Sequence, residues 1–344
     1  MAHIPDDIIK DILTRLPFTS VIRFRLVCKT WRDIIDHFQF QSDPTLIFLP
    51  HFDWDALYIL QLGQNTTTII NFTCPVHQNK YHSLYANGLC CFYPDYYCLA
   101  YCSPYSYNLV TQESIKLPDL NISLAEEYLE VPGFGYDCYN QAHKLVLFNY
   151  GMANVLTLGS TSWRTLENVP NVESLTKKPP TVNGSLHWMT TAGSIVSFDL
   201  SSENFEFIAY PQLLQTAIHD CQVVNLGGCL SIANMSPKEH IELWIMKLYN
   251  LNDSWTKLII NRSYADHIRA FRPGCVPYHV LPICIWRLRK ILLLYGHNTL
   301  VSYDIETAEY TPLQVDGISR YKISEQRRGN RQGKISLRYE VYGM

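Results

Sequence analysis

Cysteine and histidine side chains, the usual zinc ligands, are concentrated between residues 74 and 102. The members of this group are Cys74, His77, His82, Cys90, Cys91, Cys98 and Cys102. Structural zinc sites usually draw on paired cysteines separated by two residues, and the stretch contains no such pairs. Neighbouring Cys90 and Cys91 would point to opposite faces of a strand. We therefore expect free, buried thiols, with no metal and no other cofactor.

The sequence holds no catalytic constellation that we can name. A nucleophile elbow, a phosphate-binding glycine loop and a helical pair of zinc-binding histidines are all absent. His187 beside Trp188 falls in an expected buried strand, and no partner for a general base can be named, so we expect it to pack in the core. The chain is thus expected not to be an enzyme.

The distribution of tyrosines instead indicates that the chain binds another protein. They gather between residues 93 and 107, and aromatic side chains of this kind are enriched at protein interfaces. Core packing accounts for some of them. We predict that Tyr96 and Tyr97 lie on a loop near a target-binding face.

Length, charge and the first residues narrow the class of protein. A chain of 344 residues exceeds the usual size of a single core, which favours a small domain with a large or repetitive one. A net charge of -3 gives no overall attraction to nucleic acid or to an anionic membrane. No secretory signal follows Met1 and no apolar run is long enough for a bilayer, so the eleven cysteines are expected reduced, in the cytoplasm and/or nucleus.

Residues 4 to 40 have apolar positions at helical spacing and predict a small unit of three helices. Pro5, Asp6 and Asp7 suit a helix start, and Pro17 ends the first helix. That helix carries one apolar stripe: Ile8, Ile9, Ile12, Leu13 and Leu16. About forty residues cannot bury this much apolar surface alone, so the stripe predicts a partner.

The same residues resemble the F-box motif over its whole length. The matching segments are Ile4-Pro5, Ile8-Ile9, Ile12-Leu13, Leu16-Pro17, Phe24-Arg25, Val27-Cys28-Lys29 and Trp31-Arg32. The resemblance implies binding to a Skp-type adaptor and, through it, to cullin. The positions it assigns to the adaptor contact are Ile4, Pro5, Ile8, Ile9, Leu13, Leu16, Pro17, Val21, Phe24, Val27, Cys28 and Trp31. The alternative is that these residues only form the core of a helical bundle.

Beyond Pro44 short apolar runs alternate with turn residues, which predicts an all-β domain. One element recurs six times: a strand, a polar turn near Asn or Asp, and a second strand. Its turns begin near positions 61, 108, 157, 199, 250 and 304, and two copies close with Trp163 and Trp255. Spacing of about 40 to 55 residues is typical of four-stranded propeller blades, so we expect a propeller of six blades. The glycines of Asn87-Gly88, Asn183-Gly184 and Gly227-Gly228 predict a tight turn or a bulge that leads into a buried inner strand.

Several segments of this region resemble the F-box-associated domain of plants, a kelch-related family. They are Gly133-Phe134-Gly135-Tyr136-Asp137, Asn183-Gly184-Ser185-Leu186-His187-Trp188, Ser197-Phe198-Asp199-Leu200 and Leu243-Trp244-Ile245-Met246-Lys247 with Ser254-Trp255. The resemblance implies a propeller-like recognition module. We expect an F-box at 1–42, the propeller-like domain at 43–317 and a basic tail at 318–344, in which Ile335 to Tyr342 forms a strand that pairs with Leu46 to Leu49.

Together the two resemblances imply the substrate-recognition subunit of a Skp–cullin–F-box ubiquitin ligase. Such a subunit acts by proximity, since it brings a protein target close to chemistry performed by other subunits. The alternative is a protein- or glycan-binding scaffold that works outside a ligase. We expect neither a membrane nor a nucleic-acid partner, and the target is unknown.

Overall fold

The computed structural model describes most of the β domain and isolated positions before it. The described residues are 5–6, 8–9, 12, 31, 34, 45–49, 56–61, 66–71, 81–94, 103–109, 111–119, 132–149, 152–167, 169–170, 179–191, 193–211, 220–237, 239–262, 280–286, 290–295, 299–313 and 338–340. Within the N-terminal part, residues 6, 8, 9, 12, 31 and 34 are helical, as predicted for the first and third helices. The second predicted helix lies outside the described residues.

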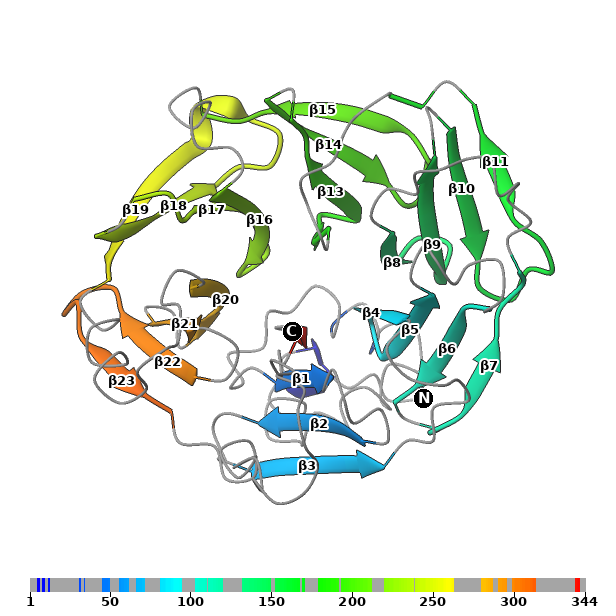
Figure 1. Cartoon of the computed structure of the whole chain (residues 1–344), viewed down its shortest axis with the longest axis horizontal. Helices are drawn as coiled ribbons and strands as arrows, with labels where there is room; N and C mark the ends of the chain where they lie inside the picture. Colours follow the sequence, from blue (N-terminus) through cyan, green and yellow to red (C-terminus); the bar gives the residue numbers. More distant parts are fainter. Residues whose placement is uncertain are drawn as a thin grey trace, which may run out of the picture.

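The described residues of the β domain form six four-stranded antiparallel sheets, arranged as a ring with one strand of each near the centre (Figure 1). Sheet 1 comprises, from the inside outward, β24 (Arg338–Glu340), β1 (Thr45–Leu49), β2 (Ala56–Gln61) and β3 (Thr66–Asn71). Sheet 2 comprises β4 (Tyr81–Ala86), β5 (Leu89–Pro94), β6 (Tyr105–Asn108) and β7 (Ser114–Lys116). Sheet 3 comprises β8 (Gly133–Asp137), β9 (Ala142–Asn149), β10 (Met152–Thr157) and β11 (Arg164–Leu166).

The other three sheets follow in chain order around the ring. Sheet 4 comprises β12 (Thr181–Val182), β13 (Ser185–Met189), β14 (Ser194–Asp199) and β15 (Phe205–Ala209). Sheet 5 comprises β16 (Cys221–Leu226), β17 (Cys229–Asn234), β18 (His240–Met246) and β19 (Trp255–Asn261), with a short 3-10 helix at Asn252–Ser254 before β19. Sheet 6 comprises β20 (Val280–Trp286), β21 (Lys290–Tyr295), β22 (Thr299–Asp304) and β23 (Tyr310–Pro312).

The element that recurs in the sequence is the turn between the third and fourth strands of a sheet, here called the outer turn. In three outer turns a side-chain oxygen accepts hydrogen bonds from backbone N–H groups two or three residues later; these residues are Asn108, Asp199 and Asp304. These hydrogen bonds form an Asx turn, which explains why each of these three copies of the repeated element has Asn or Asp at this position. Four residues after each of them the chain takes a positive φ, at Gln112, Glu203 and Ala308.

The predicted glycine turns join the first and second strands of sheets 2, 4 and 5. Both central residues have positive φ in Asn87-Gly88 (48° and 88°) and in Asn183-Gly184 (50° and 75°). Gly227-Gly228 repeats the geometry, with φ of 60° and 81°. Such turns match the twist of the flanking strands and favour Asn-Gly and Gly-Gly, as the sequence pattern predicted.

The ring closes through the C-terminal strand. β24 pairs with β1 in antiparallel register, with Ile47 opposite Glu340 and Leu49 opposite Arg338. This confirms the predicted pairing between the tail and the segment from Leu46 to Leu49. Sheets 2 to 6 are each built from consecutive strands, whereas sheet 1 combines both ends of the β domain and so leaves no unpaired inner edge on β1.

Apolar cores lie between neighbouring sheets. Sheets 3 and 4 share a core that includes Val146, Val155, Leu186 and Trp188. The contact is close because Gly133 faces sheet 4: a Cβ atom there would lie 2.6 Å from Trp188 Cζ2 and 2.8 Å from Leu186 Cδ1. A side chain at residue 133 would therefore push the two sheets apart.

We expect Gly133→Ala to lower the free energy of unfolding by about 1–3 kcal/mol, the usual cost of overpacking. Urea denaturation measures this loss. In the double variant with Trp188→Phe, the smaller ring admits the new methyl group, so the combined cost should fall below the sum of the two single costs. Strictly additive costs would show that Gly133 and Trp188 do not compete for the same space.

Candidate functional site

The first N-terminal helix presents two isoleucines to solvent. Its first turn begins at Pro5, whose carbonyl oxygen accepts hydrogen bonds from the N–H groups of Ile8 (3.0 Å) and Ile9 (3.2 Å). Ile8 is 53% exposed and Ile12 is 39% exposed, whereas Ile9 is 2% exposed. Residues four apart lie on the same face of a helix, so Ile8 and Ile12 form one exposed apolar pair. Exposed isoleucines on a short helix are typical of a protein-binding face.

The described residues include four of the predicted adaptor contacts. Pro5 and Ile8 are exposed, Trp31 is half-buried, and Ile9 is buried in the chain itself. Burial indicates that Ile9 packs inside the helical unit, so its adaptor contact stays a prediction. The remaining predicted contacts lie outside the described residues: Ile4, Leu13, Leu16, Pro17, Val21, Phe24, Val27 and Cys28. Ile12 was not among the assigned contacts, although its spacing from Ile8 places it on the same face.

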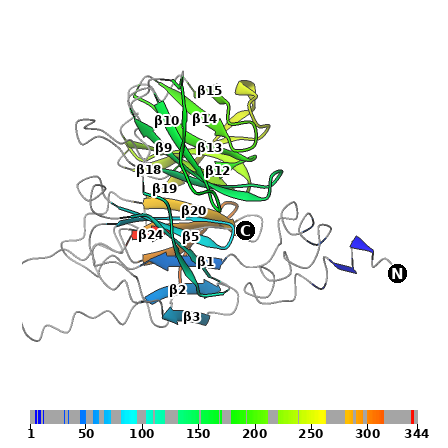
Figure 2. The ribbon, with the colours of Figure 1, turned by 90° about the vertical axis from the view of Figure 1, so that its right-hand side faces the viewer.

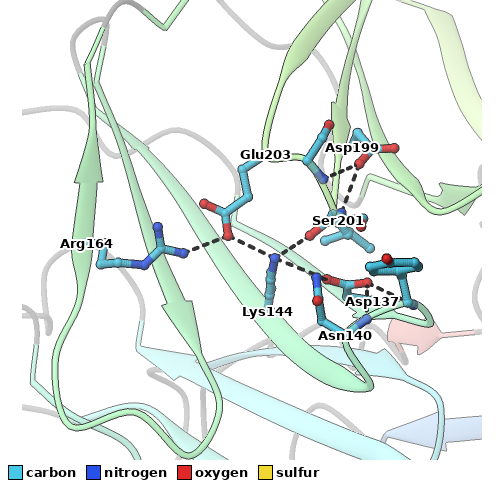
Figure 3. Close-up of polar contacts among 10 residues, drawn as sticks. Asp137, Asn140, Lys144, Arg164, Asp199, Ser201 and Glu203 are labelled. Carbon is cyan, nitrogen blue, oxygen red and sulfur yellow. Dashed lines mark hydrogen bonds and ion pairs between the residues drawn. The ribbon is translucent and has the colours of Figure 1, made fainter.

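A group of charged side chains, in which Asp137 and Lys144 are buried and Arg164 is more than half exposed, joins sheets 3 and 4 (Figure 3). Lys144 on β9 lies 3.2 Å from an Asp137 carboxylate oxygen and 2.8 Å from Glu203 Oε1. Its ammonium group also donates to the carbonyl of Leu200. Arg164 on β11 donates to Glu203 Oε1 at 2.6 Å. Two carboxylates therefore balance two cations, and Glu203 receives bonds from both cations of sheet 3.

Both carboxylates are held in the ionised form. Burial by itself raises the pKa of Asp137, but hydrogen bonds from Asn140 and the pair with Lys144 outweigh it and leave the pKa below its usual value. The same balance lowers the pKa of Glu203, where burial is opposed by bonds from Arg164 and Lys144. A neutralised, bonded group of this kind stabilises the fold and lacks a free acid or base for catalysis.

His187 is fully buried, as the sequence predicted. Its Nδ1 lies 3.4 Å from the carbonyl oxygen of Pro180, and its Nε2 lies 2.9 Å from the hydroxyl of Tyr249, in the turn that follows β18. A carbonyl only accepts, so Nδ1 carries the proton and Nε2 accepts from Tyr249. Burial lowers the pKa of His187 to about 4, against the weaker upward effect of its backbone partners, so the ring is neutral at pH 7.

Where the structure describes the cysteine-rich stretch, its two cysteines lie on strand β5. Cys90 and Cys91 are buried, and Cys91 packs in the core between sheets 2 and 3. Among the described residues no group of three or more His, Cys, Asp or Glu side chains could hold a metal ion. Cys74, His77, Cys98 and Cys102, together with the predicted target contacts Tyr96 and Tyr97, lie outside them. In the described part of the chain, no helix has the length and apolarity to span a membrane.

Comparison with known proteins finds a matching family model for the N-terminal segment and another for the β domain. The F-box domain model matches residues 1–42, and the F-box associated beta propeller domain model matches residues 45–274. The F-box protein At3g07870 of Arabidopsis thaliana is 27% identical and aligns with 93% of this chain and 89% of its own length. The F-box protein CPR1 of the same plant is 25% identical, with 92% and 85% covered.

An Arabidopsis thaliana F-box/kelch-repeat protein, At3g23880, is 25% identical and aligns with 78% of this chain and 82% of its own length. The propeller model alone spans most of the chain, and it covers strands β1 to β3 of sheet 1 and all of sheets 2 to 5. An F-box implies binding to a Skp-type adaptor. The chain therefore belongs to the family of F-box proteins that carry an F-box-associated β-propeller domain.

Proposed function

We propose that this protein is the substrate-recognition subunit of a Skp–cullin–F-box ubiquitin ligase. The F-box binds the adaptor, and the six-bladed propeller binds a protein target and holds it near the ubiquitin-charged enzyme. The chain itself performs no bond chemistry in this role, because proximity supplies the rate increase. We place this activity in the cytoplasm and/or nucleus.

The observation that carries the proposal is the exposed pair Ile8 and Ile12 on the helix that precedes the propeller. Ile9 of the same helix is buried, so the helix has both a packed face and a free apolar face. In a role outside a ligase these two side chains would have no adaptor to cover them. The propeller supports the second half of the proposal, since its rigid ring of sheets can present a target in a fixed orientation.

Co-expression with a plant Skp-type adaptor tests the adaptor contact. We expect the full chain to co-purify, and Ile8→Asp with Ile12→Asp to weaken binding at least about tenfold, because a carboxylate would be buried in the interface. Ile115→Asp is the matched control: Ile115 on β7 is 62% exposed and lies in the propeller. It should bind as the wild type does.

Thermal unfolding of all three proteins checks the fold. We expect the melting temperatures to agree, because each replaced side chain is exposed. Loss of adaptor binding by the helix variant alone supports the ligase role. If the wild type does not associate with the adaptor, the ligase proposal fails and a protein- or glycan-binding scaffold becomes the better account.

A further inference from the structure

Three aromatic side chains tie the outer strand of one sheet to the sheet before it. Trp163 Nε1 donates to the carbonyl oxygen of Pro118 at 2.9 Å, and Trp255 Nε1 donates to that of Ala209 at 3.2 Å. The hydroxyl of Tyr310 donates to the carbonyl oxygen of Asn261. The donors belong to sheets 3, 5 and 6, and the acceptors belong to sheets 2, 4 and 5.

The three contacts share one position in the repeat. Trp255 and Tyr310 are the first residues of β19 and β23, and Trp163 directly precedes β11. Ala209 and Asn261 are the last residues of β15 and β19, and Pro118 follows β7 by two residues. The outer strands follow one another around the circumference of the ring (Figure 1), so each contact joins the start of one outer strand to the end of the preceding one.

Sheet 4 departs from this pattern at the same position. Its outer strand, β15, begins with Phe205, which packs against the core between sheets 3 and 4 just as Trp163, Trp255 and Tyr310 pack in their own cores. A phenyl ring has no N–H or O–H group to donate. The aromatic hydrogen bond is therefore replaced here by packing alone, unless another group supplies the polar contact.

The charged group described above supplies a polar contact at this place. Glu203 lies in the outer turn of sheet 4, two residues before Phe205, and it reaches Lys144 and Arg164 of sheet 3. Like the other contacts, this one runs from the start of an outer strand to the preceding sheet, but it ends on β9 and on the first residue of β11 instead of the end of the outer strand. Figure 2 shows the ring from the side, with sheets 3 and 4 next to each other in one half of the ring.

From this repetition we infer that a set of rim latches holds neighbouring sheets together, and that Glu203 with Lys144 and Arg164 is the latch between sheets 3 and 4. Three of the four latches in the described part of the ring are aromatic hydrogen bonds, and the fourth is ionic. Each latch restrains the outer edge of an interface whose inner part is apolar. Loss of one latch should loosen its own interface and leave the other interfaces closed.

Hydrogen–deuterium exchange of the full chain, read by mass spectrometry, tests the ionic latch. Glu203→Gln keeps the size of the side chain and removes its charge. We expect exchange in β14, β15 and β11 to become about tenfold faster, since hydrogen bonds to charged groups contribute more than neutral ones. Glu206→Gln is the control: Glu206 is an exposed residue of β15, three positions after Glu203, and the exchange pattern of this variant should match the wild type.

Phe205→Tyr in the Glu203→Gln background tests the replacement directly, because it places a hydroxyl where Tyr310 has one. We expect it to restore most of the lost protection. Tyr310→Phe should loosen β19 and β23 and leave β14 and β15 unchanged. Equal effects of Glu203→Gln and Glu206→Gln, acceleration spread evenly over all sheets, or no recovery with Phe205→Tyr would each overturn the inference.

Discussion

Lys144→Met should lower the free energy of unfolding by about 3–5 kcal/mol, the usual cost of breaking a buried ion pair. Methionine fills a similar volume, so packing is largely kept and the loss reports the charge. Among the residues that the structure describes, the loss of the ammonium group leaves Asp137 with its hydrogen bonds from the turn that follows it, and leaves Glu203 with Arg164. The carboxylate of Asp137 would then be a buried charge without a cation.

Urea denaturation at neutral pH measures this loss, and an exposed ion pair provides its control. Lys116 lies 3.3 Å from Asp119, with both side chains more than half exposed. Lys116→Met should change the free energy of unfolding by less than about 1 kcal/mol, because solvent screens such pairs. Similar losses in both variants would show that burial does not strengthen the Lys144 contacts.

Acidification from pH 7 to pH 5 should lower the stability of the wild type by about 2 kcal/mol through His187 alone. The pKa of His187 is lowered to about 4 in the folded chain, from an ordinary value of 6.5. The unfolded chain therefore takes up this proton first as the pH falls. Stability from the neutral ring is fully present above pH 6.5 and is lost progressively down to pH 4. The pKa values of Asp137 and Glu203 are also lowered, and the stability that their ionised forms contribute is lost at lower pH.

His187→Gln removes this titration and should flatten the dependence of stability on pH between 7 and 5. The variant is expected to be less stable at pH 7, because the bond with Tyr249 changes, so the slope and not the absolute value is compared. His240→Gln is the control, since His240 is a partly exposed residue at the start of β18. A slope in His187→Gln equal to that of the wild type would contradict the assignment.

Features that depend on a few neighbouring residues could be predicted from the sequence. Asn183-Gly184 indicates its turn because the backbone needs positive φ at both positions, a conformation that these residue types adopt at low cost. Asp199 and Asp304 indicate theirs because the side chain bonds to the backbone nearby. The stripe on the first helix is equally local, since a period of 3.6 residues places Ile8 and Ile12 together.

The composite sheet was predicted with less support, because the pairing of β24 with β1 joins residues far apart in sequence. Alternation in the tail indicates a strand but does not select its partner. Strands β1 to β3 form a sheet one strand short of the others, and the missing inner position is defined only when all the sheets have assembled into the ring. In the same way, Trp163 and Trp255 were visible as recurring residues, while their acceptors on the preceding sheets were not.

The sequence by itself determined the family, the helical F-box followed by a β domain, and the turns that divide this domain into repeats. These are properties of short segments, in which local conformational preferences decide. The tertiary structure alone brought Asp137, Lys144, Arg164 and Glu203 together, from two sheets and up to 66 positions apart along the chain. A charged residue on a strand has no local reason to be buried. Only packing of the neighbouring sheets buries Asp137 and Lys144 together and brings the partly buried Glu203 and the exposed Arg164 against them.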